Sequence, residues 1–393
     1  MRKLIADIIH TGDQGFVSDQ VLLVEDSGKI LDLRPKSEFN IQECEYYPGA
    51  LVPGFINAHC HLELSHLKGQ FESGHKLIPF LKSVVQNREV DQELVLEKIA
   101  EADAEMYHGG IVAVGDISNK TDTIDTKTKS QILYHSFIEA FDFLQEHLAD
   151  KFFEDYKKVF DAFGNLPKTM VPHAPYSVSN RLFQRLIESN QQNKFPISIH
   201  NQETIDEDLL FLNKTGGFID FWESFGFSLD TFQATGKESI YYAMDRMDAI
   251  PNTLFIHNTQ MKKQHLEDVL KWNPNAYFVT CPNANLFIEN TLPEYSNFNI
   301  EGAKLCIGTD SLSSNWQLSI LEEIKTILKF NAKLNLENVL RWANYHGALA
   351  LNLDSKYGSF TKGKEPGILW IQAVEKRQNI WTLGSQPSVK RIL

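Results

Sequence analysis

The chain has 393 residues, of which 42% are hydrophobic and 23% charged, and its formal net charge is −13 at pH 7. This is the composition of a globular protein with room for one large domain and a smaller attachment. Binding of a polyanion needs a basic face, which this acidic sequence does not concentrate anywhere, so we expect neither nucleic acid nor an anionic membrane surface as partner. We expect a small-molecule substrate and leave a homo-oligomer open.

The cysteines and the N-terminal segment bear on the compartment. The four cysteines show no C-x-x-C spacing, and three of them lie in or at the ends of expected core strands, at Cys60, Cys281 and Cys306. Buried, reduced thiols explain them better than a disulfide framework. No apolar run approaches the ~18 residues of a membrane span, and Asp7 comes too early for a secretory signal. We therefore expect a cytoplasmic protein.

Both ends of the chain show the alternation of β structure. Residues 21–24 and 29–33 flank a turn at Ser27 and Gly28, which is a hairpin pattern. Near the other end, short runs at 367–371 and 380–383 show the same character. Residues 1–50 and 355–393 are therefore predicted to pair into one small composite β-sandwich.

Between these ends, short apolar runs alternate with helical patterns. The expected strands lie at residues 51–58, 110–116, 131–140, 168–173, 196–200, 253–257, 277–281 and 304–309. Eight strands alternating with helices is the count of a (β/α)8, TIM-like barrel. Two of the helices are visible as apolar stripes over 77–84 and 182–187, the second entered through Ser179 as a cap. We predict an α/β fold whose barrel spans 51–354.

Polar side chains stand where several of these strands end. The first strand is followed by His59 and His61, which project to the same side of an extended segment and can both bind one ion. Later strands lead into His200, His257 and Asp310. The structural alternative is that each histidine is a hydrogen-bonded interior residue and that Asp310 caps a helix. That explanation would be favoured for a single position, but not for five positions at the ends of successive strands. The carboxyl ends of barrel strands are also where reactive groups gather.

Imidazoles and a carboxylate are ligands that suit Zn2+ or Fe2+. We predict one divalent metal, Zn2+ first and Fe2+ second, bound by His59, His61, His200 and Asp310. This set leaves an open position for water, which becomes a hydroxide nucleophile. Glu203 follows His200 by three residues and is the acid/base candidate, with an ordinary first-turn glutamate as the alternative. His257 either orients the hydroxide and relays protons or is a fifth ligand.

The motifs around these residues, from Pro-Gly-Phe-Ile-Asn-Ala-His-Cys-His to Gly-Thr-Asp-Ser, resemble in their order the amidohydrolase superfamily. Within it the chain is similar to the mononuclear branch of S-adenosylhomocysteine and methylthioadenosine deaminases, guanine deaminase, aminodeoxyfutalosine deaminase and triazine chlorohydrolases. The resemblance covers almost the whole chain. It implies the ligand set above, proton handling by Glu203 and His257, catalytic involvement of Asp310, and a substrate contact from His173. It also implies one metal, because the fourth strand ends at His173 without the bridging lysine of binuclear relatives.

Substrate specificity is expected from the loops after the first, fifth and eighth strands, which carry Glu63, Trp222 and Ser313. Trp222 belongs to an aromatic insertion at 211–225 that either stacks on a heterocycle or forms a helix core or dimer face. Glu63, together with Glu139 and Asp116, would suit ribose hydroxyls or an amino-heterocycle, with a solvated or capping role as the alternative.

The expected reaction is hydrolytic deamination of an aminated purine or nucleoside-like heterocycle, of the aminodeoxyfutalosine or adenosine-derivative type. Metal-bound hydroxide attacks the amine-bearing ring carbon, Glu203 protonates the adjacent ring nitrogen, and ammonia leaves. Loss of chloride from a triazine is the close alternative, and hydrolysis of a cyclic amide would fit two metals. A non-catalytic barrel with a structural metal is a further alternative, against which the open position and Glu203 argue.

Overall fold

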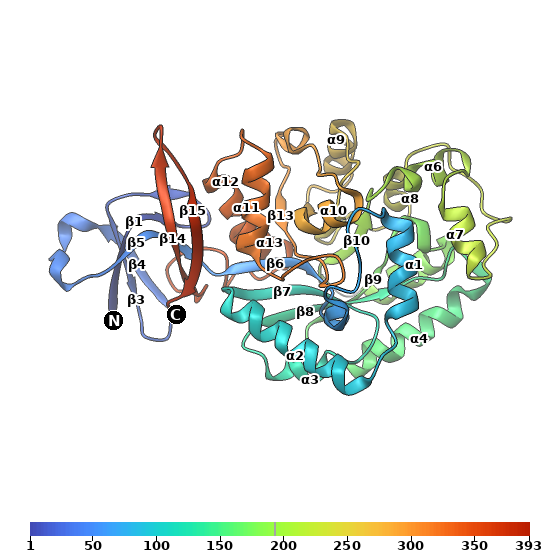
Figure 1. Cartoon of the computed structure of the whole chain (residues 1–393), viewed down its shortest axis with the longest axis horizontal. Coiled ribbons are helices and arrows are strands. Elements are labelled where there is room, and N and C mark those ends of the chain that lie inside the picture. The colour runs from blue at the N-terminus through green and yellow to red at the C-terminus, as the bar shows by residue number, and fades with distance from the viewer. Residues whose placement is uncertain (192–193) are drawn as a thin grey trace.

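Both ends of the chain form a single sheet at one end of the molecule in the computed structural model, which describes residues 1–191 and 194–393 (Figure 1). Its seven strands pair in the order β15-β14-β5-β1-β3-β4, with β2 beside β1. The strands are β1 (Arg2–His10), β2 (Phe16–Val17), β3 (Gln20–Val24), β4 (Ile30–Pro35), β5 (Glu45–Pro53), β14 (Ile368–Arg377) and β15 (Ile380–Arg391). β5 pairs parallel with β1 and antiparallel with β14, so it joins the two chain ends. The division of this sheet into two packed layers stays a prediction.

Between these two ends, the described residues form eight parallel strands in two four-stranded sheets, which pair in chain order as β6-β7-β8-β9 and β10-β11-β12-β13. They are β6 (Phe55–Cys60), β7 (Ile111–Ser118), β8 (Leu133–Ala140), β9 (Lys168–Pro172), β10 (Ile197–Asn201), β11 (Thr253–His257), β12 (Ala276–Thr280) and β13 (Leu305–Ile307). Edge contacts link the two sheets. The amide of His200 donates to the carbonyl of His173 at 2.8 Å, and the amide of Asp310 donates to the carbonyl of His59 at 3.1 Å.

The first predicted strand, 51–58, is divided between the two parts of the molecule. β5 ends at Pro53, and β6 begins at Phe55. Between them a Cβ on Gly54 would lie 2.3 Å from Cγ1 of Val112, so only glycine allows the chain to pass this close to β7. The chain thus leaves the terminal sheet and enters the parallel sheet within one residue.

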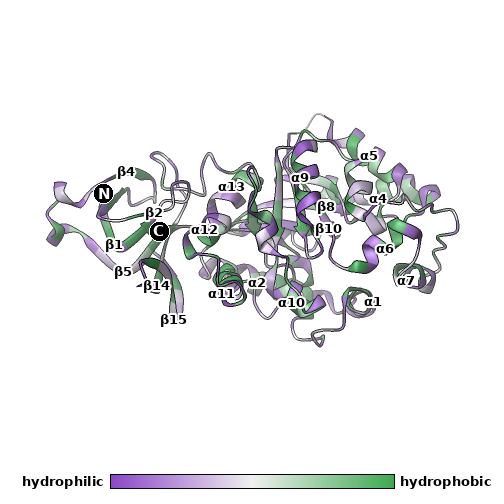
Figure 2. Ribbon diagram, turned by 90° about the horizontal axis from the view of Figure 1, so that it is seen from above, coloured by the Kyte–Doolittle hydropathy of each residue, from purple (hydrophilic) through white to green (hydrophobic). Residues whose placement is uncertain are grey.

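Helices cover the parallel strands and alternate with them along the chain. They are α1 (Leu77–Asn87), α2 (Gln92–His108), α3 (Ile124–Lys129), α4 (Ala149–Ala162), α5 (Asn180–Asn190), α6 (Ile205–Asn213), α7 (Phe218–Ser224), α8 (Ser239–Met244), α9 (Lys263–Trp272), α10 (Pro282–Glu289), α11 (Ile320–Phe330), α12 (Leu336–Arg341) and α13 (Gly347–Ala350). The predicted cap is present, because the Ser179 hydroxyl accepts from the amide of Leu182 at 3.2 Å. Figure 2 shows hydrophobic and hydrophilic residues on the same helices, as amphipathic helices require.

The strands of the parallel sheets are buried on both faces, as all-parallel sheets require when helices cover them. Cys60, Cys281 and Cys306 are free and lie in this interior, as the sequence predicted. Among the helices formed by the described residues, none is both long and apolar enough to cross a bilayer.

Candidate functional site

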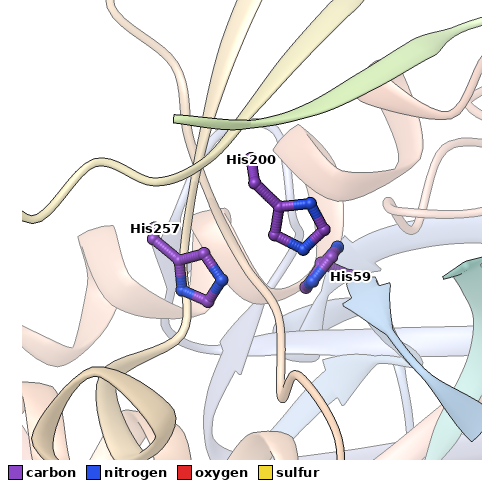
Figure 3. A group of neighbouring side chains, drawn as sticks. All are labelled: His59, His200 and His257. Atoms are coloured by element: carbon purple, nitrogen blue, oxygen red, sulfur yellow. The ribbon is translucent and has the colours of Figure 1, made fainter. Parts of the chain in front are cut away.

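Five of the predicted polar residues meet at the carboxyl ends of the parallel strands. His59 and His61 come from the end of β6, His200 from β10 and His257 from β11, while Asp310 follows β13. Figure 3 shows the rings of His59, His200 and His257 turned toward one another. The centroid of the His59 ring lies 4.9 Å from that of His200 and 5.7 Å from that of His257. Residues far apart in the sequence therefore form one cluster.

The donor atoms of this cluster fit a metal ion. Oδ1 of Asp310 lies 3.6 Å from Nε2 of His59 and 3.5 Å from Nε2 of His61, while Nε2 of His61 lies 3.3 Å from Nε2 of His200. Among residues 1–191 and 194–393, neither ring nitrogen of the buried His59 finds a hydrogen-bond partner, which is costly unless a cation is bound there. His257 can also contribute a ligand atom within 4.8 Å of those of His59 and His200, so the alternative of a fifth ligand stays open.

The protonation states of the cluster suit metal binding. Burial lowers the pKa of His59 to about 4 and that of His61 to about 3, so both imidazoles are neutral near pH 7 and keep a lone pair for a metal. Burial alone would raise the pKa of Asp310, but the neighbouring histidines, His59 first, hold it well below its usual range. His59 and His61 therefore offer neutral nitrogens beside the carboxylate of Asp310, the form in which these groups bind metals.

Nδ1 of His200, the ring nitrogen that faces away from the cluster, is in contact with two oxygen atoms. It lies 3.0 Å from the carbonyl oxygen of His173 and 3.2 Å from Oε1 of Glu139, so Nδ1 carries the hydrogen and Nε2 is left for the centre. Burial lowers the pKa of His200, but the Glu139 carboxylate outweighs it and raises this pKa to about 9. The site thus favours a positive charge at His200, which a bound cation would supply in place of the proton.

Glu203 lies beside this cluster with both carboxylate oxygens accounted for. Oε1 accepts a hydrogen bond from the Tyr176 hydroxyl at 2.9 Å, and Oε2 lies 3.5 Å from Nε2 of His257. On the other side of the His257 ring, Nδ1 donates to Oδ1 of Asn285 at 2.8 Å, so Nε2 is the ring atom that faces Glu203. A carboxylate and an imidazole in this arrangement can exchange protons with a ligand at the centre.

A cavity of about 340 Å³ opens at the cluster. Its inner end is polar and is lined by His61, His173, His200, Glu203, His257 and Asp310. Its outer wall is apolar and is formed mainly by α1 and α7, with Leu77, Leu81, Val84, Phe221, Trp222 and Phe225. Such a cavity fits a small molecule with a polar, reacting end and an apolar body.

The predicted substrate-contacting residues divide into two groups. His173, Trp222 and Ser313 line the cavity. Glu63 is not among the lining residues, because its buried carboxylate is already used: it accepts from the amides of Asn119 at 2.9 Å and Lys120 at 3.1 Å, and from Arg88 at 3.2 Å. These contacts are of the kind that the capping alternative describes, and a substrate contact by Glu63 stays a prediction.

Sequence reasoning missed three residues that shape the cavity. Arg88 and Asn119 line it and are held by the two oxygens of Glu63. Asn119 also donates to Oε2 of Glu139 at 3.2 Å. Tyr176 lies in the motif that follows His173, so its place near the site was visible in the sequence, but its bond to Glu203 was not. No local pattern marks Arg88, because only the packing of α1 brings it to the cavity.

Comparisons with known proteins point to one family. Residues 50–385 match the model of the amidohydrolase family. The adenosine deaminase of Helicobacter pylori is 28% identical over 315 residues, which is 78% of this chain and 75% of that protein. The crystal structure of Helicobacter pylori aminofutalosine deaminase with methylthio-coformycin superposes with a TM-score of 0.78 over 100% of both chains at 22% identity. Zinc-bound atrazine chlorohydrolase of Arthrobacter aurescens gives a TM-score of 0.72 over 94% of this chain and 86% of that one, at 14% identity.

Proposed function

The chain belongs to the amidohydrolase family, and we propose that it is a metal-dependent hydrolytic deaminase of an aminated purine or nucleoside-like heterocycle. The observation that carries this proposal is the position of Glu203, whose carboxylate lies 3.5 Å from His257, beside a cluster of metal-binding groups that lines the cavity. The similarity to adenosine and aminofutalosine deaminases supports the same reaction class.

One divalent cation is proposed at the cluster, Zn2+ first and Fe2+ second, with His59, His61, His200 and Asp310 as its ligands. The nitrogens of the buried His59, which no described residue hydrogen-bonds, and the neutral state of His61 support this set. When bound, the cation would supply the Lewis acidity that makes hydroxide available from water near neutral pH. A single metal is proposed because the described residues at the end of β9 offer His173 and no lysine.

The residues of the chain then manage the protons of the reaction. Glu203 accepts a proton from the attacking water and passes it to the ring nitrogen next to the amine-bearing carbon. After the new C–O bond has formed, Glu203 moves the remaining proton of the added hydroxyl to the amine. The C–N bond then breaks, ammonia leaves, and the ring carbon keeps the oxygen as a carbonyl. His257, whose ring is held by Asn285 at Nδ1, orients the nucleophile through Nε2, and Asp310 contributes its negative charge beside His59 and His61.

The body of the substrate is proposed to lie between His173, Trp222 and Ser313. Phe221 and Trp222 on α7, with Phe225 just after it, form a wall on which a heterocycle or an apolar substituent can pack. An adenosine derivative or aminodeoxyfutalosine fits this wall better than a free pyrimidine base, because a small polar base would leave the apolar outer wall without a partner.

The finer architecture is part of the same proposal. The contacts of His200 with His173 and of Asp310 with His59 support closure of the two parallel sheets into one (β/α)8 barrel over residues 51–354. The sheet shared by residues 1–50 and 355–393 is proposed as the composite β-sandwich, with separate apolar clusters that contain Leu4 and Ile5, neighbours that point to opposite faces of β1.

The test is ammonia release by the zinc-loaded protein from adenosine derivatives, aminodeoxyfutalosine, guanine, cytosine and amino-triazines, with a chloro-triazine and a cyclic amide included. We expect ammonia from an adenosine derivative or aminodeoxyfutalosine, loss of activity after treatment with a chelator, and recovery with one equivalent of Zn2+. Chloride release or ring opening without ammonia would replace deamination by the corresponding alternative.

A further inference from the structure

We propose that Tyr176 is a positioning residue that fixes the carboxylate of Glu203 for proton transfer, and that α7 holds Tyr176 in place. This inference rests on the proposed function for its consequence in turnover, but its geometry belongs to the chain alone. It assigns a second task to the aromatic insertion, which otherwise serves only as a cavity wall.

The hydroxyl of Tyr176 donates a hydrogen bond to the carboxylate of Glu203. The residue is 1% exposed, and a buried phenol needs a hydrogen-bond acceptor, which Oε1 of Glu203 provides at 2.9 Å. With Oε1 held, the plane of the carboxylate is fixed, and Oε2 is directed to the side where Nε2 of His257 lies at 3.5 Å. The carboxylate therefore presents one defined oxygen for the transferred proton.

The backbone of Glu203 is fixed separately. Gln202 has a positive φ of 47°, and the carboxylate of Glu207 accepts from the amides of both Gln202 and Glu203 at 3.1 Å. This anchor lies at the start of α6 and does not involve Tyr176. Loss of the Tyr176 hydroxyl should therefore release the end of the Glu203 side chain and leave its backbone in place.

Two residues of α7 brace Tyr176. Phe218 stacks on the Tyr176 ring, with centroids 4.2 Å apart and an angle of 21° between the planes. The indole nitrogen of Trp222 donates to the backbone carbonyl of Tyr176 at 3.0 Å. Both residues are buried, and Trp222 also lines the cavity. Phe218 and Trp222 of the insertion therefore both contact Tyr176, and Tyr176 in turn contacts Glu203.

The test is Tyr176→Phe, which removes the hydroxyl and keeps the stacked ring. We expect kcat to fall about ten- to hundredfold with KM within about twofold, because proton transfer is affected and not substrate binding. We also expect the acidic limb of the kcat profile to move to higher pH, since a carboxylate that loses a hydrogen-bond donor takes up a proton more readily.

The matched control is Tyr295→Phe. Tyr295 is also buried, its hydroxyl is hydrogen-bonded to that of Thr280 at 2.8 Å, and it does not line the cavity. This variant should change neither kcat nor the pH profile. The proposal is overturned if Tyr176→Phe behaves like Tyr295→Phe, or if its only effect is on KM.

A measurement without substrate separates this inference from the proposed function. The infrared band of the protonated Glu203 carboxyl, isolated as the difference between the wild-type protein and Glu203→Gln, is followed with pH. In Tyr176→Phe this band should appear at higher pH, whether or not any compound of the panel reacts. An unchanged band refutes the role of Tyr176, even for an active deaminase. A shifted band in a protein that releases no ammonia supports the role of Tyr176 and refutes the deaminase proposal.

Discussion

Each of the two parallel sheets carries a buried aspartate, Asp116 on β7 and Asp310 just after β13. The two aspartates differ in the group that faces their negative charge. In the first sheet, Oδ2 of Asp116 on β7 lies 2.6 Å from the ammonium of Lys127, and Oδ1 accepts from the amide of Leu62. In the second, Asp310 faces the imidazoles of His59 and His61, and within the described part of the chain it has no lysine or arginine at ion-pair distance.

We propose that this difference separates a structural carboxylate, Asp116, from a functional one, Asp310. Burial alone does not, because both aspartates are buried. The counter-charge does: the chain supplies one for Asp116 and leaves the charge of Asp310 to be balanced by a cation. Substitutions that remove either carboxylate or its counter-charge test this distinction.

The largest effect is expected from Asp310→Asn. Removal of the carboxylate takes away the only anionic ligand of the proposed set, so bound metal should fall well below one equivalent and turnover about a thousandfold or more. Asp116→Asn should retain its metal. Metal analysis after dialysis, together with the ammonia assay, checks both variants. One equivalent of metal and unchanged turnover in Asp310→Asn would break the comparison.

Glu203→Gln separates metal binding from proton transfer, because Glu203 is proposed to transfer protons and is not a proposed metal ligand. We expect metal content equal to that of the wild type and turnover reduced about 10²- to 10⁴-fold. Glu97→Gln is the matched control, since Glu97 is an exposed glutamate that pairs with Lys98 on the surface. Undiminished turnover in Glu203→Gln would remove Glu203 from its proposed role.

Lys127→Met tests the structural aspartate. It leaves Asp116 buried without a counter-charge, and breaking a buried pair in this way costs about 3 to 5 kcal/mol of unfolding free energy. The double variant Asp116→Asn/Lys127→Met should recover part of that loss. Denaturant titration measures both, with Lys129→Met as control, because Lys129 pairs with Asp125 on the exposed side of the same helix α3. A loss no larger than that of Lys129→Met would contradict the assignment.

The smallest effect concerns acid stability in the terminal sheet. Burial lowers the pKa of His10 from 6.5 to about 3, so the folded state resists a proton that the unfolded chain accepts. This contribution is complete above pH 6.5 and is lost as the pH falls; at pH 5 the loss amounts to about 2 kcal/mol. Denaturant titrations between pH 7.5 and 5 should show a shallower pH dependence for His10→Gln than for the wild type. The exposed His75, replaced in His75→Asn, should leave the slope unchanged.

The alternation of strands and helices and the positions of the polar cluster were predictable from the sequence. The pattern placed His59, His61, His200 and Asp310 after buried strands, and because parallel strands bring such ends together, local sequence was sufficient to group them. The boundary at Gly54 was missed, because an apolar run shows no break where one strand passes from one sheet to another.

The partners of individual side chains were not predictable. Glu63 follows His61 closely, but its oxygens are taken by Asn119, Lys120 and Arg88, which lie 25 to 57 residues further along the chain. The Tyr176 hydroxyl similarly reaches Glu203 only through the packing of two strand-end loops. The sequence indicates which side chains lie near the site, because they follow strand ends. Their hydrogen-bond partners depend on tertiary contacts that the sequence does not show.

The most direct test of the central claim is turnover of an adenosine-type substrate in water enriched in ¹⁸O. Hydrolytic deamination predicts one ¹⁸O in the product for every ammonia released, at the carbon that carried the amine, and loss of both signals in Glu203→Gln. Product without ¹⁸O, or no ammonia from any adenosine-type compound, would contradict it.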